Sequence, residues 1–515
     1  MTLLPRLLAS FAALCLAVFL APVQGDAFQV VDDLPPADFE VETRGPIHEA
    51  FAQLNDGVIE PGMVVPKQPP PMIPEQPPEQ RPDAANLEWI PGYWAWDAER
   101  NDFVWVSGTF RNPPIGRRWI PGHWVNADGG WRWVAGFWAP ENQQELQYTP
   151  EPPAPLENGP LIPAPNADST YVPGYWTYNN PDQRFAWRPG YWAPFRQGRI
   201  WIGPQYGWTP GGYVFTSGYW DYPLDDRGLL FAPAYFPTPL WGNPGWSYQP
   251  SFVVSIGFFF NSGFYRPGGN HFYFGNYYGN HHAGLGYRPW WGGPGNSVNN
   301  YYRWQNRGNR QWAAQHQQNF DDRRAGRAPV PPANFAQQRA QQNGKNGGLA
   351  AVTPLRTFTP ANGSLVANRP DANQKAHLDQ YRDLAKLRDN AENRAKNGGP
   401  KNGGNPGAAQ PTTLKLPPAQ PRGGPGGFGD DPFRAGTRSP QSPTGNAPKN
   451  GGNPFAGKLP SNPSENPGAG PAKGPASVAG PGIPNPYQAD QGKGPNSGPQ
   501  VGGSPNPVPP LNPGA

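Results

Sequence analysis

Aromatic side chains recur at short, regular intervals between residues 86 and 220, and polar turn sequences separate them. The recurring unit is aromatic-x-x-Gly-x-aromatic, and its glycines are mostly 14 or 16 residues apart. This period is too short for a helical repeat and fits one strand followed by one turn. Asn, Asp and Gly gather between the units, as in residues 126–130. The pattern therefore predicts a series of β-hairpins.

The repeat falls into two blocks, residues 86–138 and 171–220, joined by a proline-rich connector over residues 139–170. A degenerate copy near Trp201 fills the gap before the last unit. The motif glycines, which we interpret as structural, are Gly92, Gly108, Gly122, Gly136, Gly174, Gly190 and Gly218. The motif tryptophans, our candidate binding residues, are Trp89, Trp94, Trp105, Trp119, Trp124, Trp133, Trp138, Trp176, Trp187, Trp192 and Trp220.

The two aromatics of one unit are five positions apart, so a flat strand would direct them to opposite faces. The Pro-Gly pair of several units is typical of a type II turn, and glycine also occurs at bulges. We therefore expect each strand to bend at the glycine, leave its hairpin and enter the next. The resulting fold class is mostly β, a meander of bent, aromatic-rich hairpins over about residues 86–300.

The remaining elements are predicted from shorter patterns. Residues 251–260 form a continuous apolar run, which predicts a buried strand that pairs with residues 271–278 across a turn at 267–270. Helices are expected over residues 47–54, 309–324 and 372–396. The last of these has a narrow apolar stripe (Leu378, Tyr381, Leu384 and Leu387), so we expect it to dock weakly or not at all.

Composition separates a folded part from the rest of the chain. The 515 residues include 66 Gly and 74 Pro, yet 13% are aromatic, so one large enzyme core is excluded while a smaller aromatic one is predicted. The expected segments are a signal peptide (1–25), a proline-rich acidic leader (26–85), the two repeat blocks with their connector, an aromatic β region (221–300), a polar segment with short helices (301–396) and a disordered Pro/Gly/Asn-rich tail (397–515).

Residues 1–25 have the basic start, apolar run and small residues of a secretory signal. The single cysteine, Cys15, lies within it, so the mature chain would lack cysteine, which excludes disulfides and thiolate chemistry. We expect export to the periplasm, cell envelope or exterior, with no stable membrane span after cleavage. The formal net charge of +4 is thinly spread, and this excludes nucleic acid as a partner.

Few residues suggest catalysis or metal binding. His123, His271, His281 and His282 lack accompanying ligands at a known spacing, and a solvated loop explains the last three better than a metal site. Asp221, Asp225 and Asp226 lack a calcium-loop pattern, and a turn before Arg227 explains them. We expect no catalytic residue, no metal and no cofactor, and a protein that is not an enzyme.

The quoted units resemble the WXXGXW (also written YXWGXW) repeat family, and further blocks such as residues 44–51, 230–236 and 271–278 resemble a larger subgroup of uncharacterised bacterial exported proteins. The resemblance covers about residues 44–312. It implies export and an aromatic β repeat, and it brings no catalytic residues.

Two functions fit these observations. The first is a structural or interaction role in the envelope or outside the cell, with the aromatics buried as the cores of thin hairpins and other envelope proteins as partners. The alternative is a protein that binds cell-wall or extracellular polysaccharide through exposed faces such as those of Trp94, Trp124, Trp176 and Trp192.

Overall fold

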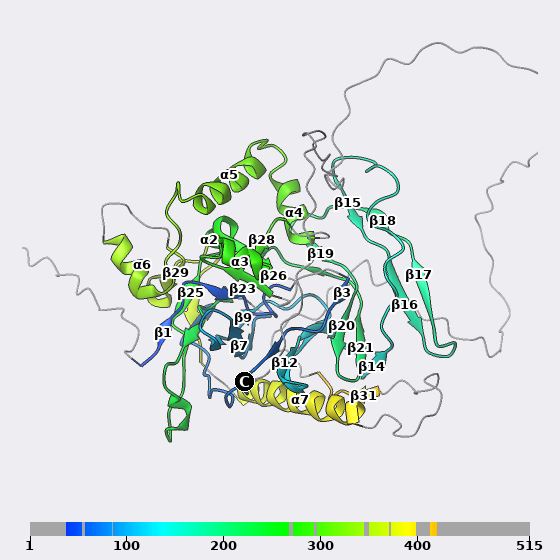
Figure 1. Cartoon of the computed structure of the whole chain (residues 1–515), viewed down its shortest axis with the longest axis horizontal. Helices are drawn as coiled ribbons and strands as arrows, with labels where there is room; N and C mark the ends of the chain where they lie inside the picture. The colour runs from blue at the N-terminus through cyan, green and yellow to red at the C-terminus, as the bar shows by residue number, and fades with distance from the viewer. Residues whose placement is uncertain are drawn as a thin grey trace, which may run out of the picture. The chain divides into compact units, whose positions relative to one another are not determined.

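The two repeat blocks form four bent β-hairpins. The structure is a computed structural model (Figure 1). It describes residues 38–53, 57–84, 86–266, 271–292, 296–343, 350–369, 372–397 and 413–419. The signal peptide, the 267–270 turn and all of the predicted tail except residues 397 and 413–419 lie outside this part. The predicted fold class is confirmed: antiparallel β-hairpins and aromatic clusters prevail.

Each bent hairpin contains two copies of the motif and four strands, an outer pair and an inner pair. In the first hairpin the outer pair is β6 (Glu88–Ile90) with β9 (Thr109–Arg111), and the inner pair is β7 (Tyr93–Asp97) with β8 (Asp102–Val106). Both arms bend at the motif glycine. The other hairpins are β10 (Arg117–Ile120), β11 (His123–Ala127), β12 (Gly130–Val134) and β13 (Phe137–Pro140); β15 (Ser169–Val172), β16 (Tyr175–Asn179), β17 (Arg184–Arg188) and β18 (Tyr191–Pro194); and β19 (Ile200–Ile202), β20 (Gln205–Thr209), β21 (Gly212–Thr216) and β22 (Tyr219–Asp221).

The predicted bend at the glycine is therefore present. The prediction that each strand leaves its hairpin at the bend and enters the next one was wrong. The two arms of a hairpin bend together and stay paired, because each motif lies opposite the other motif of the same hairpin. The degenerate copy near Trp201 is a full structural equivalent, since Trp201 pairs with Trp220 across β19 and β22.

Segments distant in the sequence extend these hairpins with short strands. Three come from the leader: β1 (Glu40–Val41) pairs with β24 (Ala234–Tyr235), which itself pairs with β8; β3 (Val58–Ile59) runs parallel to β20; and β4 (Val64–Val65) pairs with β12. A further leader strand, β5 (Gln80–Pro82), pairs with β30 (Leu365–Ala367) in a separate two-stranded sheet. The connector contributes β14 (Glu145–Thr149), which lies between β21 and β31 (Thr413–Lys415). Residues 413–415, expected to be disordered, thus form an edge strand, and β23 (Gly228–Leu230) extends the first hairpin at β9.

The apolar run at 251–260 was wrongly predicted as one strand. It divides at Ser255 into β25 (Phe252–Val254) and helix α2 (Ile256–Ser262), because the Ser255 side chain accepts a hydrogen bond from the Phe258 amide and caps the helix. β25 pairs with β29 (Val352–Pro354). The strand β27 (His271–Phe274) pairs instead with β2 (Gly45–Pro46) and β26 (Gly263–Arg266), and β26 also pairs with β28 (Arg288–Pro289).

The predicted helix at 47–54 is also wrong, since residues 49–51 form a turn. The Ala50 and Phe51 carbonyls accept hydrogen bonds from Arg111 and Arg227, over 2.8 and 2.7 Å, in place of helical amides. The observed helices are α3 (Asn280–Gly284), α4 (Ser297–Gln305), α5 (Trp312–Arg324), α6 (Phe335–Gln342) and α7 (Ala372–Asn397), with 3-10 turns at Leu224–Asp226, Leu240–Gly242 and Leu355–Thr357.

Helix α7 was predicted in place, but its weak docking was not confirmed. It packs on β6, β10 and β11, and it is drawn in yellow in Figure 1. Leu378 and Leu384 are buried, and so are the charged Arg388 and Glu392. Arg388 donates to the Pro121 carbonyl over 2.6 Å and lies 3.2 Å from the Glu392 carboxylate. Buried polar contacts therefore add to the narrow apolar stripe. No helix in the described ranges is both long and apolar enough to cross a membrane.

Candidate functional site

Two pairs of aromatic rings are in contact across each bent hairpin, one pair on either side of the bend. In the first hairpin Trp89 faces Phe110 and Trp94 faces Trp105, with ring centroids 4.9 and 5.2 Å apart and edge-to-face geometry. Equivalent pairs occur in the other three hairpins at centroid distances of 5.0–5.6 Å. Such pairs contribute about 0.5–1.5 kcal/mol each beyond their buried area, so they hold the arms of a narrow hairpin together.

The motif glycines are required by close packing and not by a type II turn. None of the motif glycines has a positive φ, which corrects the turn prediction. Instead, an aromatic ring of the facing motif covers each glycine: a Cβ at Gly108 would lie 2.4 Å from Trp89 Cζ2, and one at Gly92 would lie 2.8 Å from Trp105 Cε2. The same relation joins Gly122 with Trp133, Gly136 with Trp119, Gly174 with Trp187, Gly190 with Tyr171 and Gly218 with Trp201.

A glutamate from outside the first hairpin binds its second motif. The Trp105 indole Nε1 and the Gly108 amide donate to Glu75 Oε1 over 3.0 and 2.9 Å, and the Gly92 amide donates to Oε2 over 2.7 Å. Glu75 is 1% exposed, and burial raises its pKa to about 7 even though these three donors lower it. The segment Trp-x-x-Gly thus presents two N–H groups, one from the indole and one from the backbone, to a single carboxylate.

The same arrangement recurs in two further hairpins, and we call it the carboxylate clamp. In the second hairpin Trp133 Nε1 and the Gly136 amide donate to the two oxygens of Glu49 over 2.7 and 2.9 Å. In the third, Trp187 Nε1 and the Gly190 amide donate to Glu157 over 3.3 and 3.1 Å. In the fourth hairpin Phe215 takes the tryptophan's place and has no N–H to donate.

The environment of the clamp decides the ionisation of its glutamate. Burial raises the pKa of Glu49. Glu157 is only half-buried, and the hydroxyl of Tyr171, which donates to it over 2.6 Å, together with the clamp donors lowers its pKa. The clamp therefore stabilises a charged carboxylate, most plainly where water remains close.

The glutamates clamped by the first and third hairpins belong to straps that other indoles of the same hairpins also bind, whereas Glu49 lies in the turn at residues 49–51. Trp94 Nε1 donates to the Pro71 carbonyl over 2.9 Å, four residues before Glu75. In the third hairpin Trp176 Nε1 and Trp192 Nε1 donate to the carbonyls of Ala154 and Ile162 over 3.1 and 2.9 Å. These two hairpins thus bind proline-containing straps by backbone carbonyls and one carboxylate.

The predicted binding tryptophans fall into two classes of exposure. Five are buried and serve as core, namely Trp89, Trp94, Trp105, Trp119 and Trp138; six are half-buried, namely Trp124, Trp133, Trp176, Trp187, Trp192 and Trp220. Among the large apolar side chains of the described residues, the four most exposed belong to the third hairpin and its strap. Leu156, Leu161, Ile162 and Tyr191 are 65, 84, 67 and 54% exposed.

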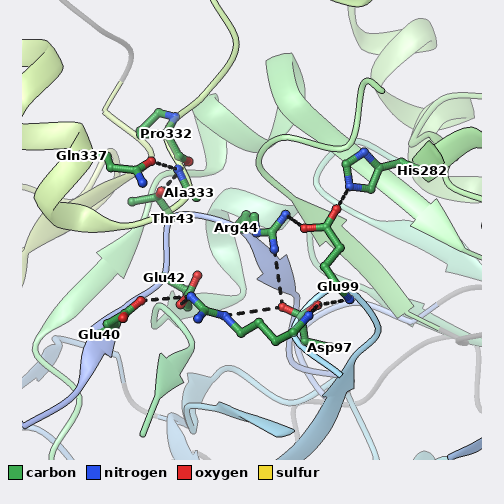
Figure 2. A network of polar contacts seen from close by, with 11 residues as sticks. Glu40, Glu42, Thr43, Arg44, Asp97, Glu99, His282, Pro332, Ala333 and Gln337 are labelled. Atoms are coloured by element: carbon green, nitrogen blue, oxygen red, sulfur yellow. Dashed lines mark hydrogen bonds and ion pairs between the residues drawn. The ribbon is translucent and has the colours of Figure 1, made fainter. Parts of the chain in front are cut away.

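Charged residues anchor the turn of the first hairpin to the leader (Figure 2). Arg44 lies between Asp97 and Glu99, and Glu99 also contacts His282. Arg100 of the same turn pairs with Glu40 and Glu42. Burial raises the pKa of Glu42 to about 7, against the lowering effect of Arg100 and Arg44. These ion pairs join the turn of the first hairpin to the leader, so we interpret the network as structural.

The other candidate polar residues also have structural partners. Asp221 accepts from Arg111 over 2.6 and 2.7 Å and lies 3.0 Å from Arg227, and a short 3-10 turn at 224–226 follows it, as predicted. His271 is buried, with Nε2 2.9 Å from the Tyr93 hydroxyl and 3.4 Å from Glu49 Oε1, so the solvated-loop interpretation was wrong for this residue. Across the described residues, no group of three or more His, Cys, Asp or Glu side chains is arranged to hold a metal ion.

The family model for the WXXGXW repeat (2 copies) matches three segments, residues 89–109, 118–139 and 170–193. The chain carries WXXGXW repeats. Each matched segment coincides with one bent hairpin, so a pair of repeats is the structural unit. The fourth hairpin has the same strand pairing outside the matched segments. No curated protein and no solved structure matches the chain.

Sequence reasoning missed the three glutamates of the clamps. Glu75 and Glu157 lie within proline-rich runs, but these runs also contain Glu79 and Glu151, so the local pattern does not single out the clamped residues. Nothing in the local pattern connects Glu49 with Trp133, which is 84 positions away.

Proposed function

We propose that this WXXGXW repeat protein is a non-enzymatic interaction protein of the cell envelope or the exterior, and that its third hairpin docks a protein partner. The observation that carries the proposal is a difference between equivalent units. Most motif tryptophans of the first two hairpins are buried beneath straps, strands and α7, whereas those of the third are half-buried. Its strap adds Leu156, Leu161 and Ile162 as exposed apolar side chains. Clusters of this kind mark interaction sites in proteins.

The chemistry of the surface indicates what the partner offers. Arg184 and Arg188 are exposed on β17 of the same hairpin. The apolar side chains of a partner segment would cover the exposed apolar side chains of the strap, and its acidic side chains would pair with Arg184 and Arg188. The export half of the proposal is supported by the apolar N-terminal run of the sequence.

The test is site-specific photo-crosslinking in the native cells with the full-length chain. A photoreactive amino acid replaces Leu161 in one variant and Ile115 in the other, because Ile115 is also exposed, at 47%, but lies outside the third hairpin. The proposal predicts a discrete protein adduct at position 161 that is weakened by Tyr191→Ser. No adduct at position 161, or the same set of adducts at both positions, would contradict it.

A further inference from the structure

We propose that a cavity between the first two hairpins binds a short oligosaccharide. Its volume is about 500 Å³, which lies in the range of about 300–1,000 Å³ typical of small-ligand sites. The walls come from the strap at residues 69–74, the two hairpins and α7. This site is separate from the exposed surface of the third hairpin.

Aromatic rings form much of the wall. Tyr93 and Trp94 contribute from the first hairpin, and Trp119, Trp124 and Trp133 from the second. Trp124 and Trp133 are half-buried, unlike the fully packed Trp94 and Trp119. Aromatic faces offer an apolar surface with a negative quadrupole, which suits the C–H faces of pyranose rings.

His123 supplies a polar group that the protein itself leaves without a partner. It lines the cavity and is 7% exposed; its Nε2 lies 3.1 Å from Glu392 Oε2, while its Nδ1 has no hydrogen-bond partner. Burial opposes ionisation of Glu392, but Arg388, His123 and Tyr148 together lower its pKa, so it is a carboxylate. Nδ1 therefore remains a buried polar atom without a partner, and a ligand hydroxyl can either donate to it or accept from it.

Helix α7 adds donors and an acceptor at the rim. Arg382, Lys386 and Asp389 all line the cavity, and Lys386 is exposed. Apolar ring faces combined with hydrogen-bond donors and an acceptor match a sugar ring, because its hydroxyl groups need hydrogen bonds on several sides. A ligand without polar groups would leave the buried Nδ1 of His123 without a hydrogen bond, and this would cost about 1–3 kcal/mol.

The experiment titrates the full-length protein with three probes, an N-acetylglucosamine disaccharide, cellobiose and a galacturonic acid disaccharide, each to about 10 mM. Tryptophan fluorescence and calorimetry report binding, because Trp119, Trp124 and Trp133 line the cavity. We expect saturable binding of at least one probe. His123→Phe should abolish it, and Lys386→Ala should weaken it about fivefold, close to 1 kcal/mol. The matched control is Lys375→Ala, an exposed lysine of α7 outside the cavity, which should bind as the wild type does.

Three results would overturn the proposal: no saturable response to any probe, equal affinity in Lys386→Ala and Lys375→Ala, or a response only to a proline-rich peptide with the sequence of residues 150–163. If His123→Phe does not fold, judged by circular dichroism, the two lysine variants decide. Because the cross-linking experiment at Leu161 concerns another surface, failure of one proposal leaves the other standing.

Discussion

Removing the carboxylate of Glu75 tests how much a clamp contributes to the fold. Glu75 accepts three hydrogen bonds, from the Trp105 indole and from the amides of Gly108 and Gly92, at 2.7–3.0 Å. All three contacts are buried, so Glu75→Ala leaves three N–H groups that water cannot easily reach.

The expected loss follows from this count. A stranded buried donor costs about 1–3 kcal/mol, and the relief from no longer burying a carboxyl group offsets part of the sum. We therefore expect Glu75→Ala to lower the free energy of unfolding by about 3–5 kcal/mol. Glu75→Gln keeps one acceptor oxygen but turns an NH₂ group toward an N–H, so it should lose about 1–2 kcal/mol.

Chemical denaturation of the full-length protein, followed by tryptophan fluorescence, measures these changes. The matched control is Glu79→Ala in the same strap, because Glu79 is exposed and its loss should change stability by less than about 0.5 kcal/mol. If Glu75→Ala unfolds at the same denaturant concentration as Glu79→Ala, the clamp does not stabilise the hairpin and the reasoning fails.

Three further predictions concern the core and its buried charges. Gly108→Ala should cost about 3 kcal/mol or more, since its Cβ would lie 2.4 Å from Trp89 Cζ2, whereas Gly242→Ala, with nothing within 4 Å, should be nearly neutral in the same denaturation assay. Asp221→Asn should cost about 3–5 kcal/mol because Arg111 and Arg227 would stay buried without a counter-charge; the exposed turn variant Asp128→Asn is the control, and equal stability of the two variants would refute the argument. Burial lowers the pKa of His48 to about 4 from a usual value of 6.5. The unfolded chain therefore takes up a proton first as pH falls, and this contribution to stability, about 3 kcal/mol, is lost between pH 6.5 and 4. Denaturation curves at pH 7 and pH 4 should show this loss for the wild type relative to His48→Gln, and parallel losses would count against it.

The hairpins were predictable because their determinants are local. A strand, a turn and a cross-strand aromatic pair all lie within about two dozen residues, so the pattern from Trp89 to Phe110 contains one complete unit. The reason for the glycine was not predictable in the same way. Pro91-Gly92 and Trp133-Val-Ala-Gly136 differ in local turn chemistry, and the facing ring that both share is visible only when the arms are paired.

The errors and omissions have a common physical origin in long-range contacts. The sequence of residues 47–54 favours a helix, but the side chains of Arg111 and Arg227 donate to two of its backbone carbonyls. Both arginines are distant in the sequence, so a local pattern does not include them. The apolar stripe of α7 predicted weak docking because it does not include the buried Arg388 and Glu392. These two side chains have their partners on the second hairpin and on β14. The clamps escaped detection for the same reason, since each glutamate lies 30 or more residues from its indole.

The most direct test of the account is a double-mutant cycle between Glu75 and Trp105. Trp105→Phe copies the natural replacement at Phe215 and removes the indole N–H, while Glu75→Gln alters the acceptor. The free energies of unfolding of the wild type, both single variants and the double variant give the coupling between the two groups. The account predicts a coupling of about 1–2 kcal/mol, as for a buried hydrogen bond to a carboxylate. Additive losses, within about 0.3 kcal/mol, would contradict the claim that the Trp-x-x-Gly motif binds a carboxylate through its indole.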